Sequence, residues 1–219
     1  VFDMQMAKCE VDSIALGACA CDYETEVIGG NTFDYPALHG RSVAGAGYSF
    51  CSASVRAVER GEVSPDGYSA VDLILGEQRS TTIGRGVTGY AFKTFSPELQ
   101  AVLRRYMAGG GALFVSGSYV ATDLWTGGEG GRAAQRGRVR VVTSHPGFSR
   151  DEYRYVNEYR PDRYRVESPD ALRPAGAGAF SVMRYVENGR TAGVASEAGG
   201  TFVMGFPFES IESDVQRDR

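Results

Sequence analysis

Polar side chains stand where three predicted strands end, and several of them could do acid–base chemistry. They are Cys51, Ser52 and Ser54 after the first strand, Glu77 and Gln78 after the second, and Ser116, Ser118, Thr122 and Asp123 after the third. Ligands of open α/β sheets gather beyond the carboxyl ends of the strands. Two carboxylates, Glu77 and Asp123, stand there, and such a pair can act as acid and base in breaking a glycosidic bond. Trp125 and several tyrosines, close by in sequence, would suit a sugar ligand.

A serine nucleophile is the second chemistry that these residues allow. Ser116 and Asp123 could form a catalytic triad with either histidine, His39 or His145. A nucleophile elbow requires a glycine two residues before the serine, however, and Phe114 occupies that position. The catalytic candidates are Glu77, Ser116 and Asp123, and the substrate-binding candidates are Gln78, Ser52, His39 and Glu209.

Each candidate also has a purely structural interpretation. Glu77 could cap a loop, and Ser116 could fill a tight turn. Glu209 is predicted to begin a final helix, where its charge would interact favourably with the helix dipole. Ser213 and Gln216 have the spacing of a capping box in that helix.

The stretch IGRGVTGY at 83–90 contains the G-x-G-x-x-G spacing of a dinucleotide site. Such a motif must follow its strand at once and open a helix. Here the preceding strand ends near Leu75 and the next helix begins near Pro97, so the glycines lie inside a long loop. The four cysteines lack the spacing of a zinc site. The sequence therefore predicts no cofactor and no metal.

The first two-thirds of the chain alternates strands and helices. Strands are predicted at 47–54, 70–78 and 112–118, with a short helix between the first two and a strong helix at 95–111. The strong helix has Ser96 at its N-cap and Pro97 at its first position, and a triple glycine ends it. Strand, helix and strand with short links place Val71–Leu75 beside Leu113–Val115, in parallel, at the centre of a sheet.

The last third has a different pattern. GRVRVVT at 137–143 alternates apolar and polar residues, and Asn188-Gly189 and Gly199-Gly200 are turn signals between apolar runs. We therefore expect an antiparallel extension over about 133–206. The whole of 1–219 is predicted to be one α/β domain: a three-layer, flavodoxin-like, mostly parallel sheet with an antiparallel C-terminal meander.

Composition narrows the function classes. A net charge of −4 argues against a nucleic-acid-binding protein, and no apolar run approaches the roughly 20 residues that span a bilayer. Nine arginines between 132 and 165 are interleaved with tyrosines. They indicate either a surface for an anionic polysaccharide or the solvent face of edge strands. Both ends of the chain are interpreted as cuts in a longer multidomain protein.

Four stretches together resemble one family. They are GGNTFDYPALHGRSVAGAGYSFCSASVRAVERGEV, VDLILGEQ, AFKTFSPELQAVLRRYMAGGGALFVSGSYVATDL and GFPFESI. They are similar to the α/β domain of large exported Bacteroidales proteins that carry the name xanthan lyase. The resemblance implies a domain that is flavodoxin-like, or glutamine-amidotransferase-like without the cysteine of that fold. It also implies fibronectin type III or carbohydrate-binding-like modules as neighbours, a glycan or peptidoglycan ligand, and a secreted, periplasmic or cell-surface location.

Two functions follow as hypotheses. The chain is a hydrolase-like domain that processes polysaccharide or cell-wall glycan, or it is a catalytically inert scaffold or carbohydrate-binding module. An enzyme needs an acid, base or nucleophile within hydrogen-bond reach of a shared space. In a scaffold, the same residues would form only local caps and turns.

Overall fold

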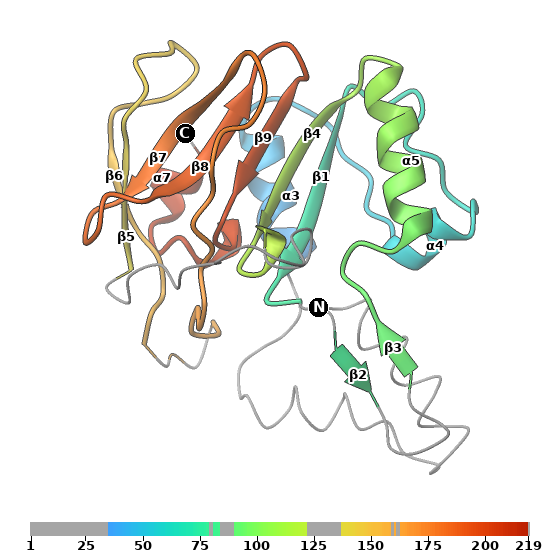
Figure 1. Cartoon of the computed structure of the whole chain (residues 1–219), viewed down its shortest axis with the longest axis horizontal. Coiled ribbons are helices and arrows are strands. Elements are labelled where there is room, and N and C mark those ends of the chain that lie inside the picture. The colour runs from blue at the N-terminus through green and yellow to red at the C-terminus, as the bar shows by residue number, and fades with distance from the viewer. Residues whose placement is uncertain are drawn as a thin grey trace.

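The computed structural model describes residues 35–78, 81–83, 90–121, 137–158, 160 and 163–218, and its centre is a curled mixed sheet of seven strands (Figure 1). Its strands are β1 (Ala70–Gly76), β4 (Ala112–Gly117), β5 (Arg138–Val141), β6 (Glu152–Arg154), β7 (Ala179–Tyr185), β8 (Thr191–Ser196) and β9 (Thr201–Met204). Their order across the sheet is β1-β4-β9-β8-β7-β5-β6. The helices are α3 (Tyr35–Gly45), α4 (Val55–Glu59), α5 (Pro97–Ala108), α7 (Asp214–Arg217) and the short 3-10 helix η2 (Phe208–Ser210).

The strand–helix–strand unit is present. β1 and β4 pair in parallel, with Val71 opposite Leu113 and Leu73 opposite Val115, so their predicted adjacency is confirmed. The predicted central position is wrong, because β1 lies at the edge of the sheet. The reason is that 47–54 forms no strand that could flank β1, and its aromatic residues Tyr48 and Phe50 remain 72% and 49% exposed.

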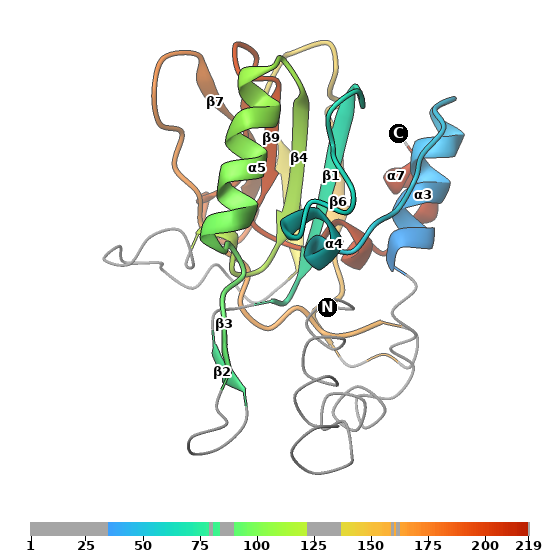
Figure 2. The same cartoon turned by 90° about the vertical axis from the view of Figure 1, so that its right-hand side faces the viewer.

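Helix α5 covers one face of the parallel strands. It begins as predicted, because the Ser96 hydroxyl accepts a hydrogen bond from the Leu99 N–H at 3.0 Å and Pro97 opens the helix. Leu99 and Leu103 pack against Leu73 and Leu113 of the sheet. Side chains alternate along a strand, so β1 presents Leu73 and Leu75 to α5 and presents Asp72 to the opposite face. Helices α3 and α7 lie on that opposite side (Figure 2).

The second half of the sheet is antiparallel. β9 pairs in parallel with β4 and antiparallel with β8, and β8, β7, β5 and β6 continue antiparallel. The predicted turns are confirmed: Gly189 (φ 69°) joins β7 to β8, and Gly200 (φ 55°) joins β8 to β9. Left-handed backbone of this kind favours glycine. The curl of this half encloses a second core, built around Val139, Val182 and Tyr185.

The prediction of a three-layer, flavodoxin-like, mostly parallel sheet is therefore wrong. The two parallel pairings are β1–β4 and β4–β9, and the four others are antiparallel. The apolar runs of β1 and β4 are typical of a parallel sheet, but β9 returns beside them and joins them directly to the meander. The G-x-G-x-x-G residues at 84–89 lie outside the described residues. They connect β2 (Thr81–Ile83) to β3 (Tyr90–Phe92), which pair antiparallel, rather than a strand to a helix.

Candidate functional site

Glu77 lies just beyond the carboxyl end of β1, beside the end of β4. Its Oε1 atom accepts two hydrogen bonds, from the Ser118 hydroxyl at 3.1 Å and from the Glu167 backbone N–H at 2.7 Å. The strands approach closely here, because a Cβ on Gly117 would lie 2.9 Å from the Cβ of Leu75. The Ser118 N–H also donates to the Gly76 carbonyl at 2.8 Å. We call Glu77, Ser118 and the Glu167 backbone the Glu77 site.

The environment of Glu77 disfavours its charge. Burial raises the pKa of the Glu77 carboxyl to about 7, and the charges of Glu167 and Glu209 act in the same direction. The hydrogen bonds from the Glu167 N–H and Ser118 oppose this rise in pKa only partly. At neutral pH the carboxyl is therefore divided between its protonated and ionised forms, which is the condition that suits a general acid or base.

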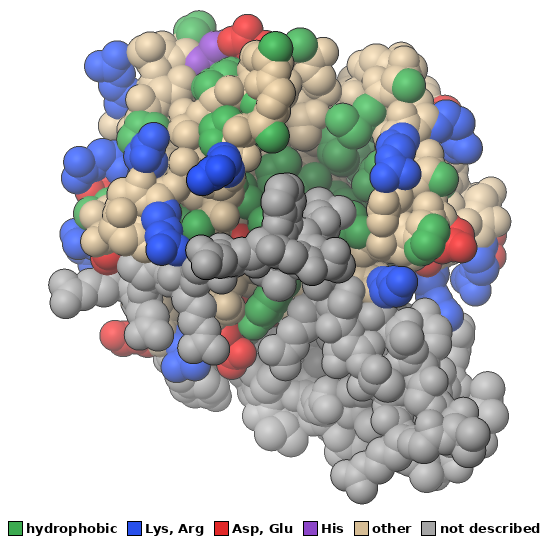
Figure 3. Space-filling model, viewed as in Figure 1, with side chains coloured by type: hydrophobic (Ala, Val, Ile, Leu, Met, Phe, Trp, Pro, Cys, Tyr) green, Lys and Arg blue, Asp and Glu red, His purple; other side chains and the backbone are tan. Residues whose placement is uncertain are grey.

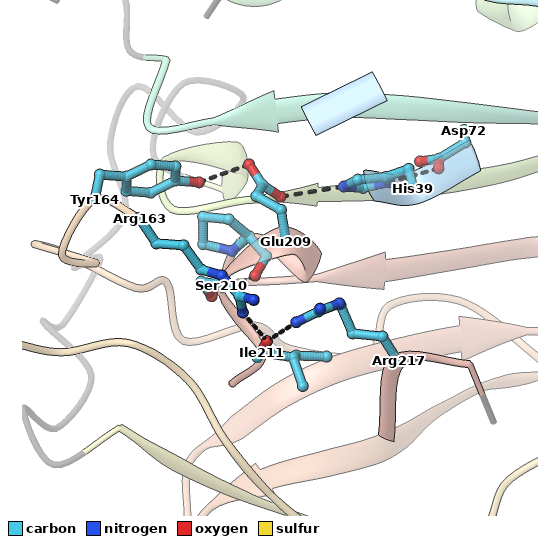
Figure 4. Close-up of polar contacts among 9 residues, drawn as sticks. His39, Asp72, Arg163, Tyr164, Glu209, Ser210, Ile211 and Arg217 are labelled. Atoms are coloured by element: carbon cyan, nitrogen blue, oxygen red, sulfur yellow. Dashed lines mark hydrogen bonds and ion pairs between the residues drawn. The ribbon is translucent and has the colours of Figure 1, made fainter. Parts of the chain in front are cut away.

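A second group of polar residues forms a connected chain on the face opposite α5. His39 Nδ1 lies 2.7 Å from Asp72 Oδ2 of β1, and His39 Nε2 lies 3.2 Å from Glu209 Oε2 of η2. The Tyr164 hydroxyl donates to the other Glu209 oxygen at 2.6 Å (Figure 4). We call Asp72, His39, Glu209 and Tyr164 the histidine network. His39 is 3% exposed and Glu209 is fully buried.

Local structure brings His39 into this network. Tyr35 and His39 are four residues apart in α3, so they lie on one face of the helix, and both are buried. The His39 ring packs against Phe208 of η2 at 4.8 Å between ring centres, and Tyr35 packs edge-on against Tyr164 at 5.3 Å.

Charge in the histidine network is balanced by pairing. Burial alone would lower the pKa of His39, but hydrogen bonds to Asp72 and Glu209 outweigh it and raise the pKa to about 9. Burial alone would raise the pKa of Glu209, but the hydrogen bond and charge of His39 lower it below its ordinary value. His39 is therefore an imidazolium at neutral pH, and it donates from both nitrogens to two carboxylates.

Two arginines hold the segment that carries Glu209. Arg163 donates to the Ile211 carbonyl at 2.6 Å, and Arg217 of α7 donates to the same oxygen (Figure 4). Arg217 also pairs with Asp214. These contacts fix the chain immediately after η2. Glu209 was predicted to begin the final helix; it lies instead in η2, and the final helix begins after Ser213, whose hydroxyl accepts from the Gln216 N–H at 3.4 Å.

The remaining predicted site residues are scattered. Gln78 is buried next to Glu77, and its backbone N–H donates to the Leu75 carbonyl at 2.9 Å. Ser116 is fully buried on β4, and its hydroxyl makes no hydrogen bond within the described chain. Ser52 is exposed in the segment before α4. Asp123, like Thr122 and Trp125, lies outside the described residues.

His145 lies elsewhere, beside an apolar hollow. It pairs with Glu197 at 3.1 Å, and its ring packs near Phe148 and Phe180. The hollow has a volume of about 280 Å³ and is lined by residues that include Phe114, Phe202 and Ala112. Ala112 begins β4, whereas Ser118 follows its end, so the hollow and the Glu77 site lie toward opposite ends of the parallel strands.

The arginine-rich segment follows the edge of the antiparallel half. Arg138 and Arg140 of β5 both reach Glu152 of β6, at 3.5 Å and 3.2 Å, and Arg138 also reaches Glu187 at 3.5 Å. Figure 3 shows Lys and Arg side chains over this edge and around α4 and α5, with hydrophobic side chains gathered between them. The pairing of these arginines with glutamates along the sheet edge agrees with one of the two predicted interpretations, in which the arginines form the solvent face of edge strands.

Sequence reasoning missed three members of these groups: Asp72, Tyr164 and the Glu167 backbone. Asp72 had a usable signal, because a carboxylate inside the apolar run VDLILG must occupy the face opposite Leu73 and Leu75. Tyr164 and Glu167 lie in a segment without regular structure. No local pattern could have placed them beside η2 and β1.

Within the described residues no group of three or more His, Cys, Asp or Glu side chains could hold a metal ion. Among the helices described there, none is both long enough and apolar enough to cross a membrane. The sequence matches no protein-family model and no curated protein.

Proposed function

We propose that this chain is a hydrolase-like, glycan-processing domain in which Glu77 is the acid–base group. The observation that carries the proposal is a carboxyl with a pKa of about 7 at the adjoining ends of two parallel strands. Catalytic acids and bases need a pKa near the working pH, and ligands of sheets with parallel strands gather beyond the carboxyl ends of those strands.

The proposed step is hydrolysis of a glycosidic bond. The proton of the Glu77 carboxyl passes to the bridging oxygen as the bond between that oxygen and the anomeric carbon breaks. Water then adds to the anomeric carbon, and its proton returns to the Glu77 carboxylate. The products are two shorter chains, one with a new reducing end, and Glu77 finishes in its starting form.

Glu209 has a supporting role in this proposal. Both of its oxygens are hydrogen-bonded, to His39 and to Tyr164, and the carboxylate is fully buried. Its charge raises the pKa of Glu77. Two carboxyls whose pKa values are driven apart by their surroundings are a recurrent feature of acid–base sites. The predicted partner carboxylate, Asp123, and the predicted catalytic Ser116 remain candidates.

The substrate class rests on the family resemblance. The resemblance to exported proteins called xanthan lyases implies a polysaccharide or peptidoglycan substrate and a secreted, periplasmic or cell-surface location. It also implies fibronectin type III or carbohydrate-binding-like modules as neighbours. These remain proposals for this chain.

The test is a screen for reducing-end release from soluble polysaccharides and peptidoglycan fragments. Loss of a general acid lowers the rate by about 100-fold to 10,000-fold, so we expect that loss in Glu77→Gln. The matched control is Glu62→Gln, an exposed glutamate paired with Arg60, which should keep the wild-type rate. A substrate cleaved equally well by Glu77→Gln would refute the role of Glu77.

A second candidate is a catalytically inert scaffold or carbohydrate-binding module. The observation that favours it is the histidine network, in which buried His39 and Glu209 use their polar atoms to bond each other, Asp72 and Tyr164 rather than a ligand. This function predicts calorimetric binding of a glycan without release of reducing ends, and no effect of Glu77→Gln on that binding.

A further inference from the structure

We propose that Ser118 and the Glu167 backbone N–H are positioning groups, which hold Oε1 of Glu77 as an acceptor so that the transferable proton resides on Oε2. The catalytic consequence rests on the proposed function of Glu77. The assignment of the proton to one oxygen does not, because it follows from hydrogen-bond geometry.

The geometry is asymmetric. Both donors, at 3.1 Å and 2.7 Å, reach Oε1. A protonated carboxyl has one hydroxyl oxygen and one carbonyl oxygen, and the carbonyl oxygen is the better acceptor. A proton on Oε1 would face the Glu167 N–H, which can only donate, so Oε2 carries the proton.

The two donors are themselves held by the fold. Ser118 is fully buried, and its N–H is bonded to the Gly76 carbonyl at 2.8 Å. Glu167 follows Val166, whose N–H is bonded to the Val156 carbonyl at 2.9 Å. Oε1 therefore keeps the same partners whether Glu77 is protonated or ionised, and Oε2 alone changes state as the proton leaves and returns.

The charged and titratable groups around Glu77 come from several elements. Glu167 and Glu209 disfavour its ionisation, whereas Ser118 and the Glu167 N–H favour it. The charge of Glu77 in turn raises the pKa of Tyr35 and of Tyr164, and Arg163 acts on Tyr35 in the opposite direction. Removing the Ser118 hydroxyl while these charges remain should therefore shift the titration of Glu77 toward higher pH.

The first experiment follows the Glu77 side-chain carboxyl by carbon-13 NMR, assigned by its absence in Glu77→Gln. Losing a hydrogen bond to the charged form of a carboxyl raises its pKa by about one to two units, so Ser118→Ala should raise the titration midpoint of Glu77 by about that amount. Ser118→Thr keeps the hydroxyl and should restore the wild-type midpoint. An unchanged or lower midpoint in folded Ser118→Ala would overturn the proposal.

The second experiment uses the wild-type protein and needs no variant to fold. As the pH rises and Glu77 ionises, the resonance of the Glu167 amide proton should move downfield with the same midpoint as the Glu77 carboxyl. The protection factor of this amide against hydrogen exchange should stay high on both sides of that midpoint. If Oε1 carried the proton, this amide would lose its acceptor, and its protection, below the midpoint. That result would refute the assignment of the proton to Oε2.

These readouts separate the two proposals. If the Glu77 carboxyl and the Glu167 amide titrate as expected but the protein cleaves no glycan, the positioning role is supported and the hydrolase function is refuted. If glycan cleavage depends on Glu77 but its pH profile is unchanged by Ser118→Ala, the hydrolase function is supported and the positioning role is refuted.

Discussion

At the scale of single residues, the chain contains two acidic side chains in opposite electrostatic situations. Glu77 is driven toward its neutral form by burial and by neighbouring negative charges. Glu209 is more deeply buried and yet remains ionised, because His39 supplies a positive charge and Tyr164 a donor. The comparison shows that the partners of a carboxyl, rather than burial alone, determine its protonation state.

Glu167→Gln should lower the pKa of Glu77. The substitution removes a negative charge that raises this pKa, and it keeps the backbone N–H that donates to Oε1. The carbon-13 titration of Glu77 should then move to lower pH, and the alkaline limb of any glycan cleavage should move with it. Glu62→Gln, an exposed control, should move neither, and an upward shift in Glu167→Gln would contradict the prediction.

His39→Ala should destabilise the protein strongly. It leaves the charge of buried Glu209 without its cation, and breaking a buried pair in this way costs about 3–5 kcal/mol. The control is His145→Ala, whose pair with Glu197 is largely exposed and is worth about 0–1 kcal/mol. Urea unfolding at pH 7 measures both. The free energy of unfolding that His39→Ala loses should be smaller at acid pH, where Glu209 can be protonated. Equal losses in His39→Ala and His145→Ala would exclude the histidine network as a stabilising unit.

The candidate residues were partly predictable. Glu77 and Glu209 follow predicted strands and His39 is one of two histidines in the sequence, and all three belong to the Glu77 site or the histidine network. The pairing of Glu77 with Glu167 and that of His39 with Glu209 were not predictable, because these residues are 90 and 170 positions apart in the sequence. Contacts over such separations depend on how the sheet is assembled.

At the scale of elements, local signals succeeded where a cap or a turn decided the structure. Ser96, Pro97 and the triple glycine define α5, and Asn188-Gly189 defines the β7–β8 hairpin. They failed at 47–54, where an apolar composition suggested a strand. Tyr48 and Phe50 are exposed there instead, and the ring of Phe50 packs where a Cβ on Gly40 of α3 would lie.

Ser96→Ala should weaken the α5–α4 region. It removes the N-cap acceptor for the Leu99 N–H and the donor to the Glu59 carboxylate. Loss of an N-cap costs about 1 kcal/mol. Ser64→Ala, in an exposed turn where the hydroxyl accepts from the Asp66 N–H at 3.2 Å, is the control and should cost less. Chemical denaturation compares the two, and a Ser64→Ala loss as large as that of Ser96→Ala would argue against the cap.

At the scale of the whole molecule, stability should be highest on the acid side of neutrality. Glu77, with a folded pKa of about 7 against an ordinary value of 4.5, stabilises the fold below pH 4.5 and loses this contribution as the pH rises to 7. His39, with a folded pKa of about 9 against 6.5, stabilises below pH 6.5 and loses this as the pH rises through 9. Glu209 acts oppositely: its lowered pKa gives stability above pH 4.5 that is lost as the pH falls.

The free energy of unfolding, measured from pH 4 to 9, should therefore peak near pH 5 and decline as the pH rises. Glu77→Gln imitates the protonated acid, so it should abolish the decline between pH 4.5 and 7 and leave the later decline, which belongs to His39. A stability maximum at pH 8 in the wild-type protein would contradict this account.

The order of the strands in the sheet has a consequence for how the chain folds during its synthesis. β9, the last of the seven sheet strands in chain order, lies between β4 and β8 and is the only described link between the parallel and antiparallel halves of the sheet. During synthesis, the paired strands β1 and β4 must wait, after β4 ends at Gly117, until β9 at Thr201–Met204 has emerged from the ribosome. Contacts between distant segments form slowly, and the exposed strand edges that wait for them tend to aggregate. A nascent chain stalled before Thr201 should therefore depend on chaperones, and release of the whole chain, which frees β9, should relieve that dependence.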